Sequence, residues 1–379
     1  MHDYRVGTEH DLSMTSDGRI NMTSNSLPNY DVVKLRNEEV RVAAIKSRLR
    51  TIEPSRAAAG IKENLLHMLW LIDYAQARTY KDLLAFHEFP LGGLNRGWNR
   101  RQCLRVAIEV PGDETEAVAR KAREYGCYIE FGCYARLQDW PNHFFNLGVI
   151  MNPKGEVILK RWWLRNLAGV TGIGTTVWDV LDEFIRRYGA DAIFPVARTD
   201  IGNLALMSET LEPEIRRAFA IKGAEIGIHY MVRGVAEKSR GYRQHPALTS
   251  SVMLPDGPDV FHLDFQAACL VNNIYGLFIQ NAVSDEGGIT IDGGVGRSAI
   301  YDCNGNIMSR AASHHEGIVE AVIPLSCYRR SHSVPRFQKQ LFSHLYGKYV
   351  PKYPPNLFME VLPDTIREGA ELYRKAANW

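Results

Sequence analysis

The sequence predicts an α/β fold of four layers, in which two mixed β-sheets pack face to face and helices cover both outer faces. Pairs of strand-like segments alternate with helix-like segments along most of the chain, which is the pattern of a layered α/β protein. No linker, repeat or low-complexity tract divides the 379 residues. Hydrophobic residues make up 45% of the chain, enough for one large core.

The first half begins with a polar stretch, residues 1–38, which we expect to be an N-terminal arm. A single domain is expected over residues 39–330. Alternating and helical apolar spacings place its first elements. The expected strands are 39–48, 81–89, 127–136 and a hairpin over 144–164, and the expected helices are 55–78 and 114–126. The apolar residues that give the first helix its spacing are Ile61, Leu65, Leu69 and Ile72.

The second half repeats the alternation and ends in an extension, residues 331–379, rich in aromatic residues and proline. The glycines at 169–174 follow no strand and precede no Lys-Ser/Thr pair, so we expect a loop without phosphate binding. We expect the C-terminal extension to lie at an oligomer interface, because it has little core of its own. The expected helices are 176–188 and 212–222, and the expected strands are 192–197, 203–207, 225–231, 274–282, 297–303 and 317–323.

Composition narrows the class of protein. The formal net charge of +2 gives no reason to expect nucleic-acid binding. No secretory leader and no apolar run of ~18 residues is present, so we expect a cytoplasmic protein without a membrane span. Six cysteines without a CxxC pair indicate reduced thiols. His314 and His315 are adjacent and would point apart on a strand, so we expect neither a metal nor a cofactor.

Several segments, in order, resemble the nitrilase superfamily of carbon–nitrogen hydrolases, in the part that contains aliphatic amidases and carbamoylases. They are LLAFHEFPLGG (83–93), FFNLGVIMNPKGEVILKRWW (144–163), PEIRRAFAIKGAE (213–225), LVNNIYGLFIQNAVSD (270–285) and GRSAIYDCNGNIMSRA (296–311). The resemblance covers residues 40–330. It implies the same sandwich fold and a site built from a glutamate, a lysine and a cysteine.

The resemblance places the glutamate at Glu88, which ends an apolar run. In the family this residue moves the proton, while the lysine stabilises the oxyanion and the cysteine attacks. Without gaps, the catalytic lysine position falls on Trp163. Lys160 matches an earlier lysine, and it could reach the oxyanion only with a different strand register. Trp162 and Trp163 are alternatives as an aromatic wall for a planar ligand.

No cysteine occupies the nucleophile position. Counting back from Pro213 gives Met207 without a gap, or Ser208 with one residue deleted, and Ser208 is chemically the closer replacement. Two hypotheses remain open for Ser208: a cap of the helix that follows, or a nucleophile that needs a base. An engineered Cys→Ser change would account for Ser208 but not for Trp163.

Other side chains are expected to line the pocket. Glu209 and Glu212 are candidates for a second carboxylate in the pocket. Since the catalytic lysine position carries no lysine, the pocket would then be acidic overall and suit a cationic or neutral substrate. The remaining expected substrate-binding residues are Phe145, His229 and Tyr230.

Two functions therefore compete. The first is a hydrolase that cleaves a non-peptide C–N bond of a small molecule, with Glu88 as general base and water or Ser208 as the attacking group. The second is a catalytically silent relative that binds a ligand or a partner protein. We favour the enzyme, because the scaffold and the loop glutamate are both retained. We also expect a homodimer or larger homo-oligomer.

Overall fold

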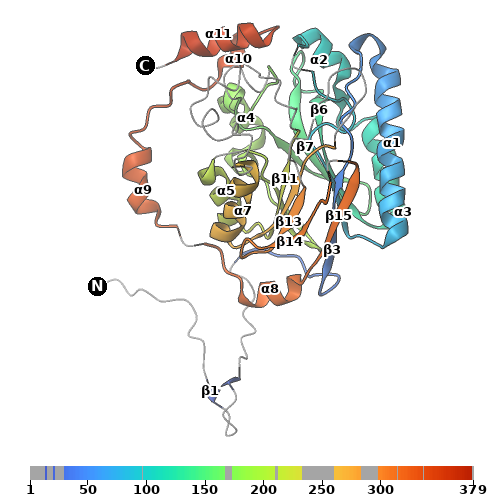
Figure 1. Ribbon diagram of the computed structural model, residues 1–379. Helices are drawn as coiled ribbons and strands as arrows, with labels where there is room; N and C mark the ends of the chain where they lie inside the picture. The colour runs from blue at the N-terminus through green and yellow to red at the C-terminus, as the bar shows by residue number, and fades with distance from the viewer. Residues whose placement is uncertain are drawn as a thin grey trace.

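The predicted four-layer α/β sandwich is confirmed. Two mixed sheets pack against each other, with α1 and α3 on one outer side and α5 and α7 on the other (Figure 1). The computed structural model describes residues 13–14, 20–21, 30–95, 97–166, 173–209, 212–232, 260–282, 298–313, 315–335 and 337–377. A separate two-stranded ribbon, β1 (Ser13–Met14) and β2 (Ile20–Asn21), lies near the N-terminus.

The first sheet has seven strands in the order β15-β3-β4-β6-β7-β8, with β5 paired to β6. Strands β3, β4 and β6 run parallel, and β6, β7 and β8 form an antiparallel meander. Gly155 takes a φ of +77° in the β7–β8 turn, a conformation that favours glycine, so the predicted hairpin is confirmed. The strands are β3 (Val40–Lys46), β4 (Leu83–Phe86), β5 (Ile108–Glu109), β6 (Tyr128–Arg136), β7 (Phe145–Met151), β8 (Val157–Trp162) and β15 (Gly317–Ile323).

The second sheet has six strands in the order β14-β13-β12-β11-β10-β9. Its centre, β10 to β12, is parallel, and antiparallel strands flank it on both sides. The strands are β9 (Ala197–Thr199), β10 (Gly202–Leu206), β11 (Ile226–Tyr230), β12 (Tyr275–Ile279), β13 (Ala299–Tyr301) and β14 (Ile307–Arg310).

Helices cover the outer face of each sheet. On the seven-stranded sheet they are α1 (Ala57–Arg78), α2 (Arg100–Val106) and α3 (Asp113–Tyr125), and on the six-stranded sheet they are α5 (Pro213–Ile221) and α7 (Val260–Asn272). Between β8 and β9 lie α4 (Leu181–Tyr188) and the short turns η2 (Trp178–Val180) and η3 (Ala190–Ile193), and η1 (Pro54–Arg56) precedes α1.

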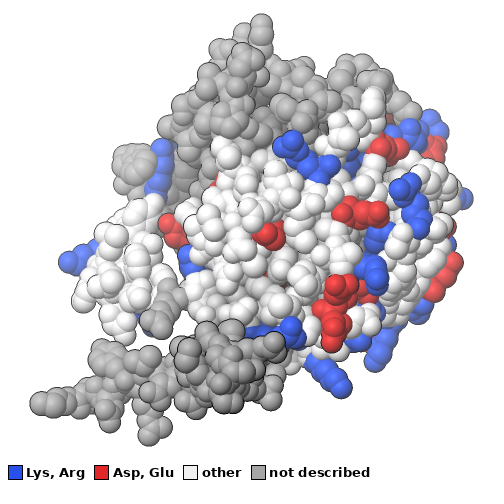
Figure 2. Space-filling view, turned by 60° about the horizontal axis from the view of Figure 1, so that its bottom comes forward, with Lys and Arg blue, Asp and Glu red and all other residues white. Residues whose placement is uncertain are grey.

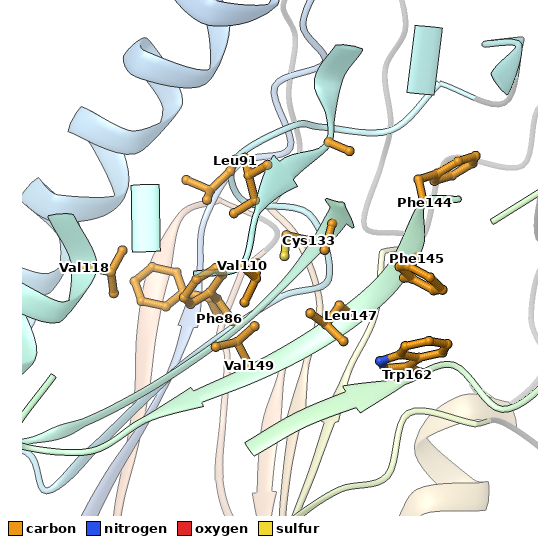
Figure 3. Packing of buried hydrophobic residues seen from close by; sticks show 14 of the residues in the cluster. Phe86, Leu91, Val110, Val118, Cys133, Phe144, Phe145, Leu147, Val149 and Trp162 are labelled. Carbon is orange, nitrogen blue, oxygen red and sulfur yellow. The ribbon is translucent and has the colours of Figure 1, made fainter. Parts of the chain in front are cut away.

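Strand alternation divides the apolar core into layers. On β4, Leu83 and Ala85 face the other sheet, while Leu84 and Phe86 face the helices. The helix-facing layer also contains Cys133, surrounded by aliphatic and aromatic side chains (Figure 3). Burial raises the pKa of this thiol, so Cys133 is a poor candidate for thiolate chemistry.

Several elements were not predicted, and one was predicted wrongly. Helices α2 and α7, the short strands β5 and β14, the β1–β2 ribbon and the helices that follow β15 had no assignment from the sequence. The segment expected as a strand at 192–197 is instead the turn η3 followed by β9, which begins at Ala197. Pro195 lies in this segment, and proline, which lacks an N–H, disfavours the interior of a strand.

The C-terminal part docks partly on the body. Helix α8 (Leu325–Ser331) follows β15, and α10 (Leu357–Glu360) and α11 (Ile366–Ala376) return to the sandwich. There the Tyr373 hydroxyl donates to Asp179 Oδ1 (2.5 Å). Between them α9 (Lys339–Tyr346) stands away from the body (Figure 1). Its Leu341 and Leu345 are 73% and 66% exposed.

The surface of the described residues carries charges of both signs, and their cysteines form no disulfide. Figure 2 shows basic and acidic side chains interspersed along one side of the face in view. No helix among the described residues is long and apolar enough to cross a bilayer, and they contain no cluster of three metal-binding side chains. The glycine-rich stretch at 169–174 lies mostly outside the described residues, as does His314. All six cysteines are unpaired, and four are buried.

An acidic side chain that has no charged partner in the described part of the chain is enclosed between the sheets. Glu130 on β6 is fully buried, and neither carboxyl oxygen has a hydrogen-bond partner among the described residues. Burial raises the pKa of this carboxyl well above its usual value. The folded protein therefore keeps a neutral acid here at a pH where the unfolded chain has released the proton.

We expect Glu130→Gln to stabilise the protein more at pH 7.5 than at pH 5. Above its unfolded pKa, a group with a raised folded pKa binds more protons in the folded state, so stability falls as pH rises, by up to about 1.4 kcal/mol per pH unit. The glutamine amide resembles the neutral acid but does not titrate. Urea unfolding of both proteins across this range measures the difference, and a gap that stays constant with pH would contradict the prediction.

Candidate active site

Glu88 lies just beyond the carboxyl end of β4, and two donors from different elements hold its carboxylate. Asn146 Nδ2 on β7 donates to Oε1 (2.5 Å), and the amide of Val232, just after β11, donates to Oε2 (3.0 Å). Glu88 is 7% exposed. Burial lowers the pKa of the neighbouring His87 to about 4, so its ring is neutral at pH 7, and its Nδ1 accepts from the Phe89 amide (3.2 Å).

The end of β10 leaves the edge of β11 open for these contacts. Pairing between the two strands ends where the Met207 amide donates to the Ile228 carbonyl (2.7 Å), after which the chain turns away. The next amides on that edge bind side chains instead: Tyr230 donates to Ser208 Oγ (3.3 Å), and Val232 donates to Glu88. Amides two residues apart on a strand are separated by roughly 7 Å. Ser208 and Glu88 are therefore neighbours along one strand edge.

Ser208 does not cap the following helix. The N-cap residue of α5 is Glu212, and no side chain makes a capping hydrogen bond there. The helix begins at Pro213, so Ser208 lies four residues before the cap, too far to reach the first free amides of α5. Its hydroxyl accepts from Tyr230 instead. The cap hypothesis for Ser208 is therefore wrong, whereas its role as a nucleophile stays a prediction.

The buried cation near the bend is Arg161, which the sequence did not single out. Its guanidinium forms an ion pair with the Glu209 carboxylate, and these side chains are 0% and 3% exposed. The Leu164 amide also donates to Glu209 Oε1 (3.0 Å). Glu209, predicted to bind substrate, is therefore engaged by the protein itself and ties the bend after β10 to β8.

A second arginine holds the other side of Glu209. Arg216 on α5 donates to the Glu209 carbonyl (2.8 Å), contacts His229 Nδ1 (3.2 Å) and pairs with Asp264 (2.7 Å). Burial, followed by the charge of Arg216, keeps the pKa of His229 well below its usual value, so its ring is neutral. The two arginines clamp Glu209 through its carboxylate and through its main chain.

Alternation along β8 separates the residues that the sequence proposed there. Arg161 and Trp163 share the face that looks toward the other sheet. Lys160 and Trp162 belong to the opposite face, where Lys160 is exposed and Trp162 packs in the helix-covered core. The prediction that Lys160 lies in the site is therefore wrong in this structure, as is the aromatic wall that would include Trp162.

Two more predicted lining residues also face away. Phe145 packs against Trp162 in the helix-covered core, with ring centroids 4.0 Å apart and the rings tilted by 38° (Figure 3). His229 packs against Phe265 and Phe278 on the α7 side of the other sheet. Neither of them points toward Glu88. Neighbouring residues of a strand point to opposite faces of the sheet. Asn146 follows Phe145 and Tyr230 follows His229, so each lies on the face opposite to its neighbour.

The Tyr230 side chain lies in the space between the two sheets, close to Glu88. Its phenol is fully buried and lies over Gly148, where an added Cβ would collide with the hydroxyl. On β6, Gly132 similarly leaves room for the main chain of Glu88. Paired across β6 and β7, the two glycines open the sheet surface for the residues around Glu88. Glu212 lies at the rim, in an ion pair with Arg165.

Sequence reasoning missed Asn146, Arg161 and Arg216. The sequence held a usable signal for the first two. On one strand of the predicted hairpin, Asn146 and Gly148 are two residues apart, and on the facing strand so are Arg161 and Trp163, so each pair shares one face. Arg216 gave no such signal, since an arginine in an amphipathic helix usually faces solvent. The donor from Val232 is a main-chain group and leaves no trace in the sequence.

The carbon-nitrogen hydrolase family model matches residues 42–332, so the chain belongs to the carbon-nitrogen hydrolase family. It is 29% identical over 151 residues to a formamidase of Helicobacter acinonychis. That match spans 39% of this chain and only 40% of the formamidase.

Solved structures share the fold at low identity. A double mutant of the amidase from Nesterenkonia sp. AN1 in complex with acrylamide is 14% identical, with a TM-score of 0.53, and the match covers 83% of this chain and 99% of that one. Nit3 of Saccharomyces cerevisiae, a member of branch 10 of the nitrilase superfamily, is also 14% identical, with a TM-score of 0.54. There the match covers 77% and 93% of the two chains.

We expect Glu209→Gln to lower the free energy of unfolding by about 3–5 kcal/mol, because it leaves a buried guanidinium without its counter-charge. The double change Arg161→Met with Glu209→Gln should recover part of that loss, since neither charge then remains. Urea unfolding of the single and double variants measures both effects.

The matched control for this prediction breaks an exposed pair, Arg367–Glu371, by Arg367→Met. That variant should leave the unfolding midpoint nearly unchanged. Equal, small effects at both pairs would mean that Glu209 does not anchor the bend.

Proposed function

We propose that the protein hydrolyses a non-peptide C–N bond of a small amide or carbamoyl compound, with Glu88 as the general base. The observation that carries this proposal is the carboxylate of Glu88, held by Asn146 and by the Val232 amide on the same strand edge as Ser208. Hydrogen bonds to a carboxylate favour its ionised form, which is the form that a general base needs.

The attacking group is water or the Ser208 hydroxyl. In the water route, Glu88 takes a proton as the water oxygen bonds to the carbonyl carbon. The tetrahedral intermediate then collapses, the C–N bond breaks, and Glu88 returns the proton to the leaving nitrogen. In the serine route, Glu88 takes the hydroxyl proton as Ser208 Oγ bonds to the carbonyl carbon. The C–N bond then breaks, Glu88 returns the proton to the leaving nitrogen, and water hydrolyses the acyl ester with Glu88 again as base. Both routes use the same base, and both yield an acid and an amine or ammonia.

The relatives support an amide as the substrate class. The partial match is to a formamidase, and the amidase that shares the fold was solved with acrylamide. Because Arg161 and Glu209 neutralise each other, we expect a neutral substrate. Formamide, acetamide and propionamide are therefore the first compounds to assay, by ammonia release.

Glu88→Gln should lower turnover of these amides by roughly 10²–10⁴-fold without unfolding the protein, because it keeps the shape but removes the base. Ser208→Ala should cost less if water attacks. Glu156→Gln, an exposed carboxylate in the β7–β8 turn, is the matched control and should behave as wild type.

Steady-state assays of the three variants, with intact-mass measurement after quenching, separate the routes. A covalent adduct on Ser208, or a Ser208→Ala variant as inactive as Glu88→Gln, would make serine the nucleophile. Near-wild-type activity of Glu88→Gln would contradict the assignment of the base. If the wild type turns over no amide or carbamoyl compound, the silent relative becomes the better description.

We further propose that the protein forms a homodimer or a larger homo-oligomer through its C-terminal extension. Helix α9 stands off the body with Leu341 and Leu345 exposed, and α7 exposes Leu270 and Val271, which are 55% and 53% accessible. Apolar side chains in this number are costly to leave in water. A second copy that covers α9 would bury its two leucines.

Replacing Leu341 and Leu345 together by lysine should convert the oligomer to a monomer in light scattering at micromolar concentration, because charged side chains resist burial. Leu66→Lys is the matched control: Leu66 is 58% exposed on α1 and should leave the mass unchanged. A wild-type protein that is already monomeric would remove the proposal.

A further inference from the structure

Buried polar atoms without partners gather around Glu88. Among the described residues, the indole Nε1 of Trp163 and Oδ1 of Asn146 are both shielded from solvent and have no hydrogen-bond partner. Buried donors and acceptors are rarely left unpaired, because each costs about 1–3 kcal/mol. When such atoms lie beside a candidate catalytic group, a polar ligand is a natural partner for them.

The two atoms lie on neighbouring strands and on one face. The Trp163 amide donates to the Asn146 carbonyl (3.1 Å), which makes these residues direct cross-strand neighbours at the open end of the β7–β8 hairpin. Side chains of such a pair start about 4.5–5.5 Å apart. Asn146 is fixed by its bond to Glu88, so its oxygen faces away from that carboxylate. A donor, an acceptor and a base thus stand side by side.

We propose that Trp163 and Asn146 together bind the amide group of the substrate, with the indole N–H donating to the carbonyl oxygen and Asn146 Oδ1 accepting from the NH₂ group. This inference rests on the proposed hydrolase function and names its substrate class as primary amides. Trp163 then serves as a neutral oxyanion donor, a role that needs a group aimed at the oxygen on which negative charge develops.

A neutral donor fits the charges of the site. Arg161, the buried cation on the same strand face, is held by Glu209, and Lys160 faces away. A primary amide offers both an acceptor and two donors, so it pairs with the indole and with Asn146 at once. A nitrile has no N–H, so it would leave Asn146 Oδ1 unpaired, which should weaken its binding by roughly tenfold or more.

The test compares Trp163→Phe with Trp162→Phe. Both changes keep an aromatic ring and remove one indole N–H, but Trp162 lies in the helix-covered core. We expect Trp163→Phe to lower kcat for propionamide by roughly 10²–10³-fold. Trp162→Phe should leave kcat near the wild-type value. Urea unfolding of both variants excludes loss of folding as the cause.

A binding measurement makes the inference independent of turnover. In the wild type, propionamide should shift the NMR signal of one indole N–H, identified by its absence in Trp163→Phe, and propionitrile should bind at least tenfold more weakly. If the shift and the preference occur without turnover, the inference stands and the proposed function fails. If propionamide is hydrolysed equally well by Trp163→Phe, or if the nitrile binds as tightly as the amide, the inference is overturned and the hydrolase function remains.

Discussion

The buried ion pair between Arg161 and Glu209 is the constraint on which the site depends. It joins the second strand of a hairpin in one sheet to the residue after Ser208 in the other sheet. The Leu164 amide adds a hydrogen bond to the Glu209 carboxylate, which offsets part of the cost of removing the pair from water. The bend after β10 is therefore held in place, and α5 begins only at Pro213. The edge of β11 beyond β10 remains available to Ser208 and Glu88.

In the proposed hydrolase, that constraint also decides which groups would meet the substrate. The charges of Arg161 and Glu209 cancel within the protein, so in the proposed site recognition would pass to groups that are formally neutral, the asparagine amide and the indole. The carboxyl oxygens of Glu88 lie beside them. A site of this composition distinguishes ligands by the pattern of their donors and acceptors rather than by their net charge.

The sequence predicted the layers of the fold and singled out Glu88, but it did not predict which face of a sheet each strand residue occupies. The order of the elements and Glu88 follow from periodicity and from local motifs, which depend on residues close together in the chain. Lys160, Phe145 and His229 were misplaced because a strand residue faces one layer or the other according to its pairing partners, and a shift of one position exchanges the faces. The partner of Arg161 lies 48 residues away, so no local pattern could reveal that a charge there would be buried.

The fit of the Tyr230 ring over Gly148 has a consequence for how the protein can diverge. Any side chain at position 148 would need the space that the phenol occupies, and a smaller residue at position 230 would leave a cavity between the sheets. Neither residue can be replaced alone without loss of packing. Over evolutionary time the two positions should therefore be inherited as a unit, and a lineage that changes one should also change the other.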